Sequence, residues 1–101
     1  MYIDMNNAKK QNAAGTADKR LVVERVQTGV KIEKRILKIL KAFAEYRDMT
    51  LGDLLEGIVL HVFEGKNPFG EESLGVIANL KKIYKLDLEA NDSHQLLETE
   101  N

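Results

Sequence analysis

A single segment of this chain has the strict alternation of apolar and polar residues that is typical of a β-strand. Within residues 25–32, one face of an extended chain is apolar or β-branched, and consists of Val26, Thr28, Val30 and Ile32. A lone strand leaves its backbone N–H and C=O groups unpaired, and the sequence offers no second convincing strand. The simplest partner is the same strand from a second copy of the chain.

The residues after this segment repeat with the period of an α-helix. Between Lys34 and Arg47 one stripe is apolar, made of Ile36, Leu37, Leu40, Phe43 and Ala44, and the opposite side is basic. Thr50 predicts the N-cap of a second helix, with Asp53 three residues later, and Gly65 is suited to its end. The apolar face of this second helix is broad, so we expect it to be buried against a neighbouring subunit.

The remaining residues predict further helical structure. Residues 71–84 have the pattern of a third helix, and Asn91 or Asp92 is suited to cap a last short helix through Leu97. The chain thus divides into a flexible N-terminal arm (1–20), a strand–helix–helix unit (21–64) and a helical extension (65–101).

Composition excludes most catalytic classes. The 101 residues suffice for one small domain, and the lack of cysteine excludes disulfides, thiol chemistry and zinc knuckles. Asp92, Ser93 and His94 have the residue types of a hydrolase triad, but neighbours in sequence cannot point at one another as that mechanism needs. We therefore expect a cytoplasmic protein that is not an enzyme and has no cofactor, no metal and no membrane span.

Charge is distributed unevenly along the chain. Residues 1–47 hold 11 Lys/Arg and 5 Asp/Glu, a net +6, whereas residues 48–101 hold 4 Lys/Arg and 11 Asp/Glu, a net −7. If the fold separates the two halves, the basic half attracts phosphates and the acidic half suits a basic partner.

One strand followed by two helices and a short turn resembles the ribbon-helix-helix family of small bacterial DNA-binding proteins. The resemblance covers about residues 24–64, and rests on the strand end Val30-Lys31-Ile32, on the first-helix stripe, and on the second-helix start at Thr50-Leu51-Gly52-Asp53. It implies a mainly α fold with one N-terminal β-strand, in which two chains intertwine around a two-stranded ribbon. The implied dimer core consists of Val26, Val30, Ile32, Ile36, Leu40, Phe43, Leu54, Leu55, Ile58 and Val62.

The resemblance also implies that the protein binds duplex DNA as a transcriptional regulator, either a repressor or an antitoxin. The ribbon residues facing the bases are Gln27, Gly29 and Lys31; Gln pairs with adenine and Lys with guanine, whereas Gly29 has no reading side chain. The implied phosphate contacts are Arg25 and the start of the second helix, Thr50, Leu51 and Gly52, where nearby Asp48 and Asp53 oppose an anion.

A second interpretation stays open. Alternating segments and Thr caps are common in proteins that never bind DNA. The chain is then a helical dimer that acts as a protein-interaction module, and its acidic second half binds a protein partner. Residues 66–101 lie outside the resemblance, so their role is open: enlarging the core, contacting a neighbouring dimer, or binding that partner.

Overall fold

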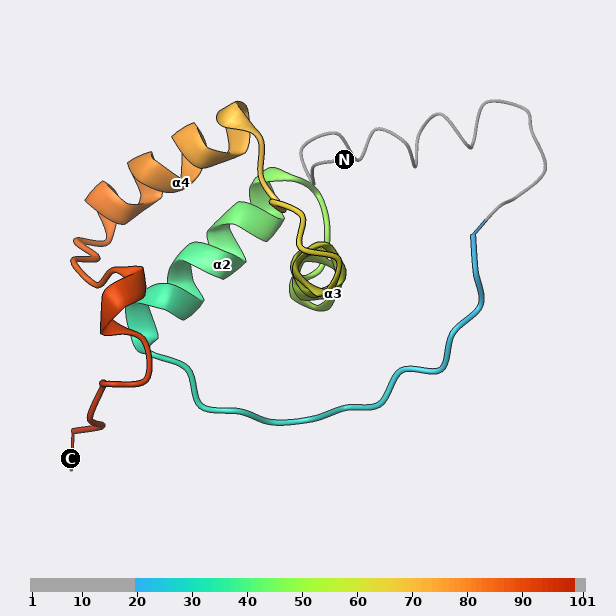
Figure 1. The fold of residues 1–101 in the computed structure, drawn as a ribbon, viewed down its shortest axis with the longest axis horizontal. Helices are drawn as coiled ribbons and strands as arrows, with labels where there is room; N and C mark the ends of the chain where they lie inside the picture. The colour runs from blue at the N-terminus through green and yellow to red at the C-terminus, as the bar shows by residue number, and fades with distance from the viewer. Residues whose placement is uncertain (1–19, 100–101) are drawn as a thin grey trace.

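The computed structural model describes residues 20–99, which form three α-helices and one short 3-10 turn. The elements are α2 (Lys34–Tyr46), α3 (Leu51–Phe63), α4 (Glu71–Ile83) and η2 (Ala90–Asp92). Helix α2 is central and packs against both α3 and α4 (Figure 1). Of the expected N-terminal arm, only Arg20 lies within the described residues.

Each end of α2 is fixed by local interactions. The Glu33 carboxylate accepts the N–H of Ile36 at 2.9 Å, which satisfies one of the free amides of the first turn. Beyond Tyr46 the chain turns through Asp48, whose φ of 58° is left-handed and cannot continue a helix. The Met49 N–H donates to the Ala44 carbonyl at 3.0 Å, so the turn between α2 and α3 is tight.

The predicted boundaries of the second helix are confirmed. The Thr50 hydroxyl accepts the Asp53 N–H at 3.0 Å, and α3 begins at Leu51. Gly65 has a φ of 71°, and the Lys66 N–H donates to the His61 carbonyl at 2.8 Å. This left-handed glycine closes the helix, as its position in the sequence indicates.

The predicted β-strand is wrong. Residues 20–33 run as an extended segment that forms neither a strand nor a helix, and every regular element in the described part of the chain is a helix (Figure 1). Alternation provides the side chains for a strand, but a sheet also needs a second backbone, and no described residue supplies one. The expected ribbon-helix-helix arrangement, two chains intertwined around a two-stranded ribbon, is therefore not the fold that the structure contains.

The last predicted helix is also corrected. The only helical turn after α4 that the described residues contain is η2, Ala90–Asp92, and residues 93–99 continue without regular structure. The Asp92 carboxylate accepts the Glu89 N–H at 2.8 Å, so this residue caps the turn from within and does not start a helix.

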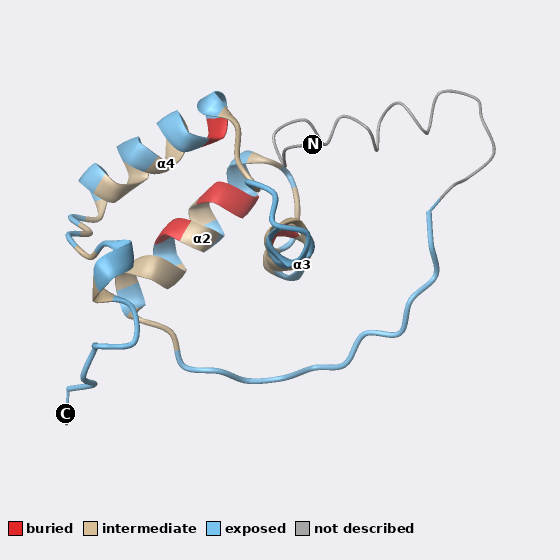
Figure 2. Ribbon diagram, viewed as in Figure 1, coloured by how far each residue is buried: buried red, intermediate tan, exposed pale blue. Residues whose placement is uncertain are grey.

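The core lies within one chain, where α2 meets its two neighbours. Phe43 and Leu54 are 1% and 0% exposed, and the smaller Ala44 is buried beside them (Figure 2). The Phe69 ring, from the link before α4, meets the Phe43 ring edge to face at 5.4 Å between centroids. These contacts join all three helices around one aromatic side chain.

Two arginines of the α2 region connect this core to α4 and to the segment after α4. Arg35 donates to the Lys85 carbonyl at 2.9 Å and to the Asp87 carboxylate at 3.1 Å, which fixes the segment after α4. Arg47 donates to the buried Ser73 hydroxyl at 3.0 Å, which fixes the first turn of α4.

Replacing Leu54 with Ala removes the fully buried contact of α3 with α2. We expect the free energy of unfolding to fall by about 2–5 kcal/mol, because a large apolar side chain is lost and a cavity remains. Urea denaturation followed by circular dichroism measures this change. Leu74→Ala, at a half-exposed position of α4, is the matched control and should cost much less; equal losses would contradict this account of the core.

Candidate nucleic-acid interface

The three residues predicted to contact bases lie together on the extended segment. Gln27, Gly29 and Lys31 are all exposed, and within the described residues no backbone–backbone hydrogen bond involves the amides of residues 21–32. In Figure 1 the segment passes around the helices before it enters α2. Side chains and backbone of this segment are therefore accessible to a large partner.

Nothing in the described part of the chain requires a glycine at position 29. A Cβ built at this position meets no atom within 4 Å, and its backbone conformation is not one that excludes other residues. A side chain would fit without strain in the protein as it stands. The lack of a side chain here permits another molecule to approach the backbone closely.

Arg25, predicted to contact a phosphate, is paired with α3 instead. Its guanidinium donates two hydrogen bonds to the Glu56 carboxylate, both at 2.7 Å. This bidentate pair lowers the pKa of Glu56 below its ordinary value, chiefly through the hydrogen bond from Arg25 and also through its charge. Asp53 adds to the negative field around Arg25. The pair places the extended segment beside the N-terminal half of α3.

Lys31 has a much weaker contact. Its ammonium lies 3.4 Å from the Glu98 carboxylate, and the two side chains are 88% and 71% exposed. Exposed pairs of this kind contribute little to stability, because water and salt screen them. A polyanion would have to replace Glu98, and the loss of this contact would cost little.

The N-terminus of α3 keeps only part of its capacity for a phosphate. Thr50 caps the Asp53 amide, while Gly52 is exposed and a Cβ there would have only the Thr50 hydroxyl nearby, at 4.0 Å. Asp53 lies in the first turn and opposes a second anion. Leu51 is half-buried, and because its side chain is apolar, only its backbone N–H is able to contact a phosphate.

Basic residues of α2 extend the positive surface beyond the segment. Lys34, Lys38 and Lys41 are exposed, whereas Arg35 is turned toward Glu33 and the segment after α4. Residues 20–47 hold eight Lys/Arg and three Asp/Glu. The described part of the basic half is therefore strongly positive, and most of its lysines face solvent.

The residues predicted as a dimer core divide into two groups. Phe43 and Leu54 are buried within the chain, and the half-buried members are Ile32, Ile36, Leu40, Leu55 and Ile58. Val26, Val30 and Val62 are exposed. Sequence reasoning overlooked Glu56 and Glu98, because each partner is more than thirty positions away and no local pattern identifies it.

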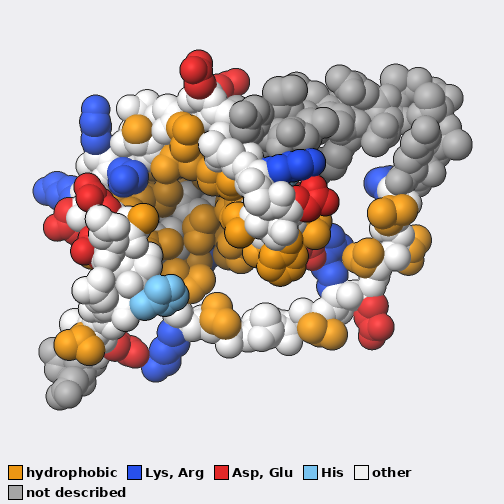
Figure 3. All heavy atoms as spheres, in the orientation of Figure 1, with side chains coloured by type: hydrophobic (Ala, Val, Ile, Leu, Met, Phe, Trp, Pro, Cys, Tyr) orange, Lys and Arg blue, Asp and Glu red, His pale blue; other side chains and the backbone are white. Residues whose placement is uncertain are grey.

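Apolar side chains also gather on the exposed side of α3. Val59, Leu60, Val62 and Phe63 are all exposed, and Phe63 is 79% exposed. In Figure 3 apolar side chains cover the middle of the visible face, over α2 and α3. An uncovered apolar surface of this kind is typical of a site of protein association.

Among the described residues, no group of three or more His, Cys, Asp or Glu is placed to hold a metal ion. None of the helices of residues 20–99 has the length and apolar character needed to cross a membrane.

Comparison with known proteins finds no match to any protein family, to any curated protein or to any solved structure. The resemblance to the ribbon-helix-helix family remains a prediction from the sequence pattern.

The Arg25–Glu56 pair predicts a measurable shift in the folded protein. Because the carboxylate pKa is lowered on folding, the pair stabilises the fold above the pKa of unfolded Glu, and this contribution is lost as pH falls through the lowered value. A carbon-13 NMR titration should show a lower pKa for Glu56 in the wild type than in Arg25→Gln. In the control Lys31→Gln the Glu56 pKa should stay low; an equal pKa in all three proteins would contradict the pairing.

Proposed function

We propose that this chain is a cytoplasmic, non-enzymatic regulator of transcription that binds duplex DNA as a homodimer. The observation that carries the proposal is the extended segment 20–33, which leaves Gln27, Gly29 and Lys31 exposed on the basic half of the chain. The segment contacts α3 through the exposed Arg25–Glu56 pair and is continuous with α2.

The chemistry of these residues suits base edges. A Gln amide can donate to and accept from adenine in the major groove, and a Lys ammonium can donate to the guanine O6 and N7 atoms. Gly29, between them in sequence, allows the backbone to approach within hydrogen-bonding distance of a base or phosphate. An extended segment is narrow enough to enter a DNA groove while the helices of the protein stay outside it. The unpaired backbone N–H groups of the segment are additional hydrogen-bond donors.

Phosphates would be bound by the lysines around the segment. Lys34, Lys38 and Lys41 are exposed on α2. Each phosphate neutralised releases counterions, so affinity for duplex DNA should fall steeply with salt. The acidic second half repels DNA, and this repulsion favours binding through the basic half only.

A second copy of the chain would cover the exposed apolar side of α3. Val59, Leu60, Val62 and Phe63 lie within two turns of one helix and are 42–79% exposed, so covering each contributes a part of the about 1.5–3 kcal/mol that full burial of such a side chain gives. A homodimer also doubles the number of segments that contact DNA. Two weak contacts joined in one molecule bind far more tightly than either alone.

Fluorescence anisotropy on a pool of random duplex DNA, at two salt concentrations, tests this proposal. Lys31→Ala should weaken binding by about 1–3 kcal/mol, roughly five-fold to 150-fold, and should reduce the salt dependence. Gly29→Ala should also weaken binding but leave the urea midpoint unchanged, because the folded chain has room for its methyl group.

The matched control is Lys66→Ala, which removes one positive charge outside the segment, at a residue paired with Glu64 at 3.1 Å. If Lys66→Ala weakened binding as much as Lys31→Ala, the segment would not be the contact. If the wild type bound no duplex at low salt, DNA binding would be wrong and the acidic second half would be the surface to examine.

A further inference from the structure

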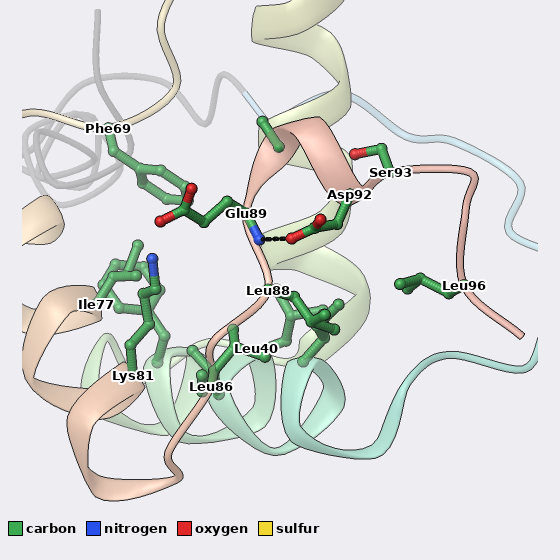
Figure 4. A pocket seen from close by; sticks show the side chains of 14 residues that line it. Leu40, Phe69, Ile77, Lys81, Leu86, Leu88, Glu89, Asp92, Ser93 and Leu96 are labelled. Atoms are coloured by element: carbon green, nitrogen blue, oxygen red, sulfur yellow. Dashed lines mark hydrogen bonds between the residues drawn. The ribbon is translucent and has the colours of Figure 1, made fainter. Parts of the chain in front are cut away.

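A hollow of about 400 Å³ lies between α2, α4 and the segment that follows α4 (Figure 4). Its walls are apolar, and include Leu40, Phe43, Phe69, Ile77 and Leu88. Sites for small ligands have volumes of about 300–1,000 Å³, are mostly apolar, and carry a few polar groups that orient the ligand. The size and lining of this hollow place it in that class.

Three charged side chains line the hollow: Lys81, Glu89 and Asp92, whose carboxylate accepts the Glu89 N–H. Lys81 is half-buried on α4, and Glu89 is exposed just before η2; in Figure 4 their charged ends point toward the same end of the hollow. Among the described residues no ion pair joins them, and the Lys81 ammonium has no hydrogen-bond partner there. The Lys81 ammonium and the Glu89 carboxylate therefore lie at one apolar site without a direct ion pair between them.

The segment that carries Glu89 is fixed. Glu89 and Asp92 form a capping box around η2, in which the Asp92 carboxylate accepts the Glu89 N–H at 2.8 Å. A carboxylate has about four lone-pair positions, so Glu89 keeps acceptor capacity for another group. Arg35 holds the chain a few residues earlier, through Lys85 and Asp87. Both charged groups are thus carried on ordered elements.

We propose that this hollow binds a free α-amino acid with an apolar side chain. The Lys81 ammonium binds the ligand carboxylate, the Glu89 carboxylate binds the ligand ammonium, and the apolar walls take the side chain. The two opposite charges favour a zwitterion over a fatty acid or an apolar amine, each of which leaves one charge unmatched. The site is separate from the DNA-contacting segment and does not depend on the proposed function.

Four ligands that differ by one group test this proposal on the full chain. They are L-leucine, 4-methylpentanoate without the ammonium, 3-methylbutylamine without the carboxylate, and glycine without the side chain. In nitrogen-15 NMR titrations, L-leucine should give saturable shifts of residues lining the hollow, such as Ile77 and Leu88. The three analogues should bind about ten-fold more weakly or worse, because each loses either a charged hydrogen bond or the apolar contact.

Two charge-removing variants, each with a matched control, test the assigned groups. Lys81→Ala and Glu89→Gln should weaken L-leucine binding by about ten-fold or more, and Gln at position 89 can still accept a capping hydrogen bond. Lys82→Ala and Glu71→Gln remove the same charges from exposed positions outside the hollow and should bind as the wild type does. Equal binding of L-leucine and either charged analogue, or no saturable shift with L-leucine, would overturn the proposal.

Discussion

The packing of Phe43 and Leu54 where α2 meets α3 is the contact on which the rest of the structure depends. Only Ile39, Phe43, Ala44 and Leu54 are buried apolar residues among those described. Phe43 also meets Phe69, so the same ring fixes the link to α4. Since hydrophobic burial is the main favourable term in folding, we expect a core this small to give the described fold a low free energy of unfolding.

The small core explains what lies outside it. One chain buries the inner side of α3 but leaves Val59, Leu60, Val62 and Phe63 uncovered. It also leaves segment 20–33 extended. This segment contacts α3 through the Arg25–Glu56 pair and continues into α2. These two features are the basis of the proposed dimer and of the proposed DNA contact, and both result from how little surface the three helices cover. The hollow beside Lys81 is another uncovered apolar surface, and it lies between α2, α4 and the segment that follows α4.

Features determined by neighbouring residues were predictable from the sequence. Thr50 caps α3 and Gly65 ends it, because a hydroxyl and a left-handed glycine act over three or four residues. The strand predicted over residues 25–32 is absent, because alternation describes only side chains, while a sheet needs a second backbone. The partners of Arg25 and Lys31 could not be predicted from the sequence either, since Glu56 and Glu98 are brought close only by the folded chain.

The central claim is that a second copy covers the exposed side of α3, and sedimentation equilibrium of the full chain tests it most directly. At micromolar concentrations the wild type should have the mass of a dimer. Phe63→Ser, at a residue 79% exposed in the single chain, should shift the equilibrium toward the monomer. Leu97→Ser, at a residue that is 95% exposed and lies outside the helices, should remain dimeric. A folded wild-type monomer at these concentrations, or equal effects of the two substitutions, would contradict the account.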